Sequence, residues 1–175
     1  MKIRESVEND KKYIRKVHQN SFDQSEGEVV SQLAIDLLED KTALPVLSLV
    51  AEQDNEIVGN IIFSSVSIES VEEVSAYILA PLAVTRIAQS RGIGTQLINA
   101  GLEILKERGA GLVLVYGDPN YYRRTGFKAG HNLKPPHKLK YPEEAWMAQE
   151  LVEGILAKTE GVVQCASSLD SPEHW

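Results

Sequence analysis

The stretch Gln89-Ser90-Arg91-Gly92-Ile93-Gly94 separates the apolar run Tyr77 to Val84 from a helical pattern that starts near Thr95. Because glycine lacks a Cβ atom, the backbone at Gly92 and Gly94 can approach a ligand closely and direct N–H groups at an anion. The start of the following helix adds partial positive charge. The stretch therefore predicts a phosphate-binding loop, with an ordinary helix entrance as the alternative.

Two common nucleotide-binding loops do not fit this stretch. A Walker A loop requires Gly-Lys-Ser/Thr, whereas Gly94 is followed here by Thr95 and Gln96. A dinucleotide fingerprint requires Gly or Ala where Leu97 stands, and an acidic residue about 20 positions further on. The segment at that distance, Gly111 to Gly117, holds no Asp or Glu. We therefore expect the anion to be neither a nucleoside triphosphate nor a dinucleotide.

The charge distribution favours a phosphate ligand. The chain has 18 Lys and Arg against 25 Asp and Glu, a net charge of -7, yet no acidic residue occurs from Val74 to Leu102 or from Tyr121 to Pro142. Buried strands lack charges in any case, which explains Val74 to Val84 but not the loops. Local positive potential in an acidic chain suits a polyanionic ligand. The basic residues of the two windows are Arg86, Arg91, Arg123, Arg124, Lys128, Lys134, Lys138 and Lys140.

Alternating apolar patterns predict one α/β domain. With 175 residues and 43% hydrophobic content, the chain can bury one sizeable core, so we expect a single domain over residues 1–175. The residues Asp54-Asn55 predict a hairpin turn between two strands. Beyond Phe127 we expect a basic, proline-interrupted loop and two more strands. The expected strands are Lys2 to Glu5, Val46 to Glu52, Glu56 to Ile68 and Val74 to Val84, and the expected helices are Asn9 to Ser21 and Glu26 to Glu39.

The residue composition also limits the expected cellular location and argues against a disulfide and a metal site. The single cysteine, Cys165, excludes an internal disulfide, and we expect it to pack as a small apolar residue. The four histidines do not have the spacing of metal ligands, so we expect no metal. No signal peptide or membrane span is visible, which predicts a cytoplasmic protein without a membrane partner.

The glycine loop and the elements that follow it match the pattern of a known protein family. The pattern Arg or Gln, two residues, Gly, any residue, Gly or Ala is matched from Gln89 to Gly94. A helix from Thr95 to Arg108, a strand from Gly111 to Gly117, and Tyr122 four residues before Gly126-Phe127 follow at matching distances. In these features the chain resembles the GNAT superfamily of N-acetyltransferases. The stretch Gly117-Asp118-Pro119-Asn120-Tyr121-Tyr122 and the later stretch Tyr141 to Leu151 resemble a bacterial subgroup of predicted N-acetyltransferases.

The resemblance implies both a fold and a reaction. The implied fold is the α/β GNAT fold, with a mixed, mostly antiparallel central sheet splayed at the fourth strand and flanked by helices. The implied reaction is direct transfer of the acetyl group of acetyl-CoA to an amine. Pro81 cannot donate to a sheet ladder, which agrees with a bulge and splay in the fourth strand.

The resemblance also implies site residues. Tyr122 corresponds to the tyrosine that protonates the sulfur of coenzyme A, and Tyr121 is expected to be a packing partner. The backbone near Leu82 or Ala83 is the candidate N–H donor to the oxyanion. The residues expected to bind the cofactor are Leu82, Ala83, Val84, Gln89, Ser90, Arg91, Gly92, Ile93, Gly94 and Thr95.

The sequence does not identify the general base or the acceptor amine. Many family members carry an acidic residue on the fourth strand, where this chain has none. Water held by backbone carbonyls is one route for the proton, and Glu26, Glu28, Asp118 and His137 are candidates that capping or solvated roles explain equally well.

The acceptor is expected to be a small-molecule amine or the amine of a peptide or protein. The acidic balance argues against nucleic acid as a partner, and a homodimer is left open. Two alternatives to the enzyme are an acyl-CoA-binding sensor or regulatory module without turnover, and a scaffold without a small-molecule ligand.

Overall fold

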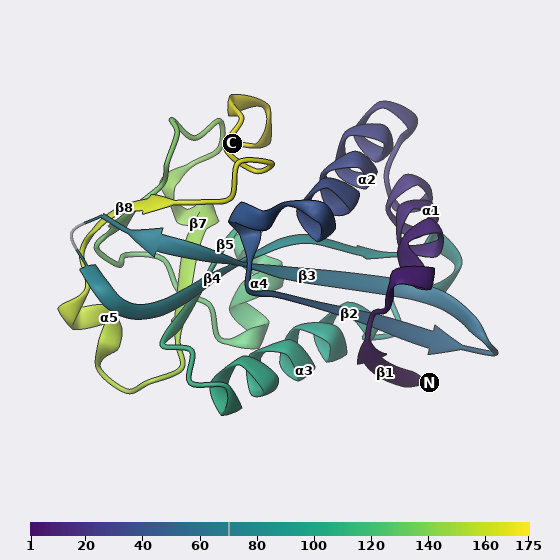
Figure 1. The fold of residues 1–175 in the computed structure, drawn as a ribbon, viewed down its shortest axis with the longest axis horizontal. Coiled ribbons are helices and arrows are strands. Elements are labelled where there is room, and N and C mark those ends of the chain that lie inside the picture. The colour runs from purple at the N-terminus through teal and green to yellow at the C-terminus, as the bar shows by residue number, and fades with distance from the viewer. Residues whose placement is uncertain (70) are drawn as a thin grey trace.

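The computed structural model describes residues 1–69 and 71–175 and is built around a central β-sheet (Figure 1). The strands are β1 (Lys2–Glu5), β2 (Val46–Gln53), β3 (Glu56–Ile68), β4 (Val71–Val84), β5 (Leu112–Tyr116), β6 (Leu133–Lys134), β7 (Trp146–Glu150) and β8 (Gly161–Gln164). The sheet follows the order β1-β2-β3-β4-β5-β7, and β8 pairs with β3 and β6. The β4–β5 and β6–β8 pairs are parallel and the others are antiparallel. The predicted α/β fold with a mixed, mostly antiparallel sheet is therefore confirmed.

Helices cover both faces of this sheet. Figure 1 shows α1 (Lys11–Ser21) and α2 (Gln24–Glu39) on one face and α3 (Ile93–Glu107) on the other. Two short helices, α4 (Pro119–Tyr122) and α5 (Ile155–Lys158), lie in the second half of the chain. Within the described residues, no helix has the length and apolar composition needed to cross a membrane.

The alternation of side chains along β3 explains the two-layer packing. Ile62 belongs to the apolar cluster that includes Leu37 of α2, whereas its neighbour Phe63 belongs to the cluster that includes Leu97 of α3. Successive side chains of a strand point to opposite faces. A Cβ atom at Gly101 of α3 would lie 2.2 Å from the Phe63 ring, so this glycine lets the helix approach the sheet closely.

The fourth strand is irregular and then separates from its neighbour. In the pairing of β3 with β4, Phe63 faces Leu79 and Ile61 faces Leu82, so Ala80 and Pro81 together oppose one residue. The parallel pairing of β4 with β5 ends at Leu79. The bulge and splay that the family resemblance implies are therefore present at Pro81, and the end of β4 has β3 on one edge and a gap on the other.

The element boundaries differ from the predicted ones in identifiable places. Helix α3 begins at Ile93, two residues before the expected start, because Gly92 in the left-handed region already forms its N-cap. The strand β4 begins at Val71 rather than Val74. A short 3-10 helix (Glu8–Asp10) precedes α1, where one continuous helix was expected. Three strands rather than two follow Phe127, because the two-residue strand β6 pairs with β8.

A buried polar pair joins α1 to the sheet. His18 is fully buried, and its Nε2 lies 2.8 Å from Oδ1 of Asn60 on β3. The Asn60 amide in turn donates to Ser48 Oγ and to Leu49 O. Among the described residues, Nδ1 of His18 has no hydrogen-bond partner. Since Nε2 must donate to the asparagine oxygen, the imidazole is the neutral Nε2–H form, and burial lowers the pKa of His18 to about 4.

This histidine makes the stability of the fold depend on pH. An unfolded histidine has a pKa near 6.5, so below that pH the unfolded chain binds a proton that native His18 does not bind until about pH 4. The free energy of unfolding should therefore fall by about 2 kcal/mol between pH 8 and pH 5 through this group alone. Urea unfolding of the wild type and of His18→Gln at both pH values measures it.

The difference between the two proteins isolates His18, because the other titrating groups are common to both. We expect a smaller loss of stability in His18→Gln than in the wild type. His137→Gln, which changes a partly exposed histidine and leaves His18 in place, serves as the control. Equal losses in the wild type and His18→Gln would contradict a neutral, buried His18.

Candidate active site

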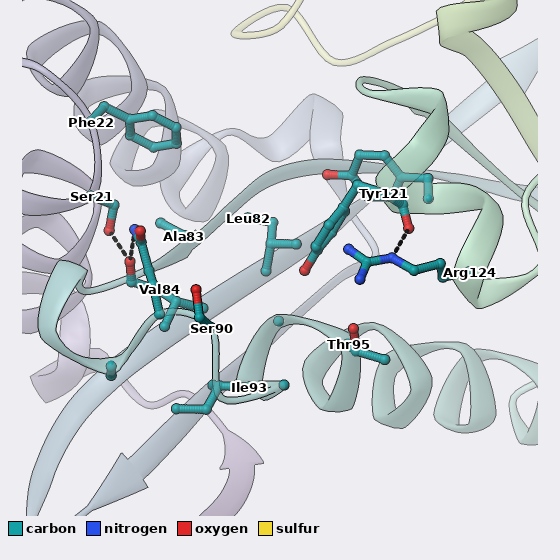
Figure 2. Close-up of a pocket in the computed structure, with 15 residues that line it drawn as sticks. Ser21, Phe22, Leu82, Ala83, Val84, Ser90, Ile93, Thr95, Tyr121 and Arg124 are labelled. Carbon is teal, nitrogen blue, oxygen red and sulfur yellow. Dashed lines mark hydrogen bonds between the residues drawn. The ribbon is translucent and has the colours of Figure 1, made fainter.

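A cavity of about 680 Å³ lies at the gap where β4 leaves β5 (Figure 2). Its walls come from the end of α1, the end of β4, the glycine loop with the first turn of α3, and the segment around α4. This volume is within the range of small-molecule sites. The lining residues are Ser21, Phe22, Leu82, Ala83, Val84, Ala88, Gln89, Ser90, Gly92, Ile93, Gly94, Thr95, Tyr121, Tyr122 and Arg124.

The glycine loop turns sharply into α3 and leaves the helix start open. Ser90 and Gly92 have φ values of 63° and 79°, a left-handed conformation that suits glycine. Gly92 is the N-cap of α3, and no side chain of the described residues caps this end. The N–H groups of the first turn, at Ile93, Gly94 and Thr95, therefore remain for a ligand. A 15-residue helix with an open N-terminus is well suited to bind an anion.

The second glycine of the loop makes room for a tyrosine. A Cβ atom at Gly94 would lie 2.2 Å from the Tyr121 hydroxyl, so any larger residue would require the Tyr121 side chain to move. Figure 2 shows Tyr121 reaching down toward Thr95 on the first turn of α3. The Arg124 guanidinium lies 4.9 Å from the centre of the Tyr121 ring. One phenol and one cation thus face the open end of α3.

The free edge of β4 carries a defined pattern of backbone groups. The Thr85 N–H donates to Val58 O on β3 at 2.8 Å. Because opposed residues of antiparallel strands alternate between bonded and non-bonded pairs, Ala83 also directs its N–H and C=O at β3. Leu82 and Val84 then direct theirs into the gap. Of the two candidate oxyanion donors, the register favours Leu82 over Ala83.

Two side chains already bind one of these gap-facing groups. Gln89 Nε2 donates to Val84 O at 2.8 Å, and Ser21 Oγ lies 2.8 Å from the same oxygen and shares its single proton between Val84 O and Val17 O. A carbonyl oxygen has two lone pairs, so the described side chains fill this acceptor. The Val84 N–H and both backbone groups of Leu82 remain available on the gap side for an extended ligand.

The two tyrosines of α4 face the same cavity in different settings. The Tyr122 ring packs edge-on against Phe127, with centroids 5.9 Å apart, and against Tyr121 at 5.1 Å. Burial raises the pKa of Tyr122 above its ordinary value, and the nearby Tyr121 and Asp118 add to the effect. The Tyr122 hydroxyl is therefore protonated at neutral pH and can act as a proton donor.

The candidate bases from the sequence do not line the cavity. The Asp118 carboxylate accepts from the Asn120 N–H at 2.9 Å and so caps α4. His137 Nε2 lies 2.6 Å from Asp170 Oδ1, in the C-terminal part of the chain. Glu26 and Glu28 are exposed near the start of α2. Among the described residues, no group of three or more His, Cys, Asp or Glu is arranged to bind a metal ion.

The cavity gathers most of the residues singled out in the sequence and adds others. Ten of the eleven candidate site residues line it, and Arg91, which is exposed, does not. Arg124 belongs to one of the two basic windows, but no sequence feature separates it from its neighbours. The lining residues that sequence reasoning did not assign to the site are Ser21, Phe22, Ala88, Tyr121 and Arg124.

Comparison with known proteins is consistent across sequence and structure. A family model described as an acetyltransferase (GNAT) domain matches residues 46–129. The chain is 37% identical over 160 residues to YjhQ of Escherichia coli K12, an uncharacterized N-acetyltransferase, with 87% of this chain and 85% of that protein covered.

Two solved structures are similar over nearly the whole chain. One is YhbS from Escherichia coli, a GNAT family N-acetyltransferase in complex with CoA, with a TM-score of 0.87 and 29% identity over 98% of this chain and 92% of that one. The other is a GNAT family acetyltransferase from Brucella melitensis in complex with acetyl-CoA, with a TM-score of 0.72 and 31% identity over 97% of both chains.

Proposed function

Because this chain belongs to the GNAT family of acetyltransferases, we propose that it transfers the acetyl group of acetyl-CoA directly to an amine within the cavity between β4 and β5. One observation carries the proposal. A single cavity brings together an open helix N-terminus, an unpaired strand edge and two tyrosine hydroxyls. These three features suit the diphosphate, the amide-bearing arm and the thioester of the donor, respectively.

The residues present fit this ligand. The first-turn N–H groups of α3 can receive the diphosphate, with Arg124 and the Tyr121 hydroxyl facing the same point. The Leu82 C=O and the Val84 N–H, which face the gap, can pair with the amides of the pantetheine arm, as an added strand would. The glycine at position 94 leaves room for the Tyr121 hydroxyl at the start of the helix.

Acetyl transfer requires two hydrogen donors near the thioester, one for the carbonyl oxygen and one for the departing sulfur. The acetyl donor supplies an activated carbonyl, whose oxygen gains negative charge when an amine attacks. The Leu82 N–H, which faces the gap, is placed to donate to that oxygen. The departing sulfur needs a proton, and Tyr122, held protonated by burial, supplies it in this proposal.

The amine must arrive in its neutral form. A lysine-like amine has a pKa of about 10.4 and an α-amino group one of about 8, so both lose a proton before attack at neutral pH. The fifteen cavity-lining residues include no carboxylate and no histidine. We propose that water near the backbone carbonyls of the gap receives this proton. The acceptor is a small-molecule amine or the amine of a peptide or protein, and a homodimer and a cytoplasmic location stay predictions.

Calorimetric titration of acetyl-CoA into the wild-type protein is the first test, and we expect binding in the micromolar range, about 8 kcal/mol in free energy. A panel of amines is then supplied with acetyl-CoA, and release of the CoA thiol is followed. Binding with amine-dependent thiol release supports the enzyme. Binding without release from any amine favours the acyl-CoA sensor, and no binding removes the proposed function.

A further inference from the structure

The turn between α1 and α2 is fastened to the end of β4 at two points. Ser21, the last residue of α1, lies 2.8 Å from Val84 O and also within hydrogen-bond distance of Val17 O in its own helix. One residue later, the Phe22 carbonyl accepts from Arg86 Nη2 at 3.0 Å. Both partners, Val84 and Arg86, lie at the exit of β4. We call this pair of contacts the α1–β4 clamp.

The clamp places an aromatic side chain in the wall of the cavity. Phe22 lines the cavity together with Ser21. In Figure 2 the Phe22 ring lies above the segment Leu82 to Val84, whereas Ser90 and Ile93 of the glycine loop lie below it. The ring therefore lies on the side opposite to the loop.

This arrangement separates the cavity into two sides. The loop and α3 cover one face of the sheet, and α1 and α2 cover the other. If the diphosphate lies at the start of α3, an acceptor has to reach the thioester from the face where Phe22 stands. The size of the space beside Phe22 depends on the position of the turn between α1 and α2. The α1–β4 clamp holds this turn in place.

We propose that Phe22 sets the size of the amine that the enzyme accepts, and that Ser21 and Arg86 are positioning residues that hold Phe22 in place through the α1–β4 clamp. The inference rests on the proposed function, since it requires the thioester to lie beside Leu82. Neither Ser21 nor Arg86 touches the reacting atoms in this proposal. They hold the part of the cavity wall that the Phe22 ring forms.

The test uses conjugates and so does not depend on the natural acceptor. CoA is joined through its sulfur and an acetyl linker to methylamine in one conjugate and to naphthylmethylamine in another, and both are titrated calorimetrically. The ratio of their dissociation constants reports the acceptor side, because any change in affinity for the common CoA part cancels. We expect the wild type to bind the larger conjugate at least about tenfold more weakly than the smaller one, the scale of steric discrimination in pockets.

The variants separate the wall from the clamp. Phe22→Ala should bring the ratio close to one, and Ser21→Ala and Arg86→Ala should lower it by about threefold or more because the wall becomes mobile. Ser21→Thr keeps the hydroxyl and should restore the wild-type ratio, which a merely destabilising change would not do. Ser25→Ala, on the exposed first turn of α2, is the matched control and should leave the ratio unchanged.

The possible failures are distinct. A wild-type ratio in Phe22→Ala overturns the role of Phe22, and a wild-type ratio in both Ser21→Ala and Arg86→Ala overturns the clamp. A wild-type protein that does not bind CoA itself overturns the proposed function, and this inference with it.

Discussion

Tyr122→Phe is expected to slow acetyl transfer by at least about 100-fold while leaving the affinity for acetyl-CoA nearly unchanged. The phenylalanine ring keeps the packing against Phe127 and Tyr121, so the change removes a proton donor and little else. If the departing sulfur depends on that donor, the loss falls on turnover. Thiol release at saturating acetyl-CoA, with the best amine of the panel, measures the turnover rate, and calorimetry measures the affinity.

Tyr121→Phe is the matched control for this prediction. Its hydroxyl faces Gly94 at the start of α3, where the diphosphate is proposed to lie. We expect its loss to weaken acetyl-CoA binding by a few fold, about the value of one hydrogen bond, and to leave the turnover rate within about threefold. The reverse pattern, a large turnover loss in Tyr121→Phe and a small one in Tyr122→Phe, would transfer the role of general acid to Tyr121.

The strand, the glycine loop and the presence of the helix after it could be predicted because their signals are local. Gly92 and Gly94 mark a turn with special backbone angles, and Pro81 marks an interruption of the strand ladder. The apolar repeat of α3 gives its buried face. Each of these signals is contained in a few consecutive residues, so the sequence alone was sufficient for this part of the site.

The side of the cavity lined by Ser21 and Phe22 could not be assigned to particular residues from the sequence, because its signals are not local. Ser21 and Phe22 end an ordinary amphipathic helix, and only contact with Val84 and Arg86, more than 60 positions away, gives them a role. His18 likewise looks like any helix residue until Asn60, 42 positions away, is placed beside it.

The positions of the two tyrosine side chains also depend on contacts that the sequence does not reveal, even though the two residues are adjacent. Tyr121 and Tyr122 are adjacent in sequence, and the helical rotation between neighbours sends their rings to different places. The motif spacing favoured Tyr122, but it gave no reason to expect that Tyr121 would face Gly94 and share the cavity. Which of the two lies nearer the phosphate end depends on how α4 packs against α3, and packing of this kind is absent from a spacing rule.

Thr95→Glu is expected to raise the dissociation constant of acetyl-CoA by at least about 100-fold. Thr95 lines the cavity at the third position of α3. A carboxylate placed about 4 Å from a phosphate charge opposes it by about 3 to 4 kcal/mol at the effective dielectric of such sites, and 2.7 kcal/mol corresponds to about 100-fold. Calorimetric titration at physiological ionic strength measures the change.

The choice of position 95 separates loss of binding from loss of folding. Glutamate is favoured in the first turn of a helix, because its charge interacts well with the helix dipole and its side chain suits the third position. The thermal midpoint of Thr95→Glu should therefore equal or exceed that of the wild type. Thr95→Gln has the same shape without the charge and should bind acetyl-CoA several-fold more weakly than the wild type at most. If Thr95→Glu binds as tightly as Thr95→Gln, the diphosphate does not lie at the start of α3, and the assignment of the glycine loop as its cradle is wrong.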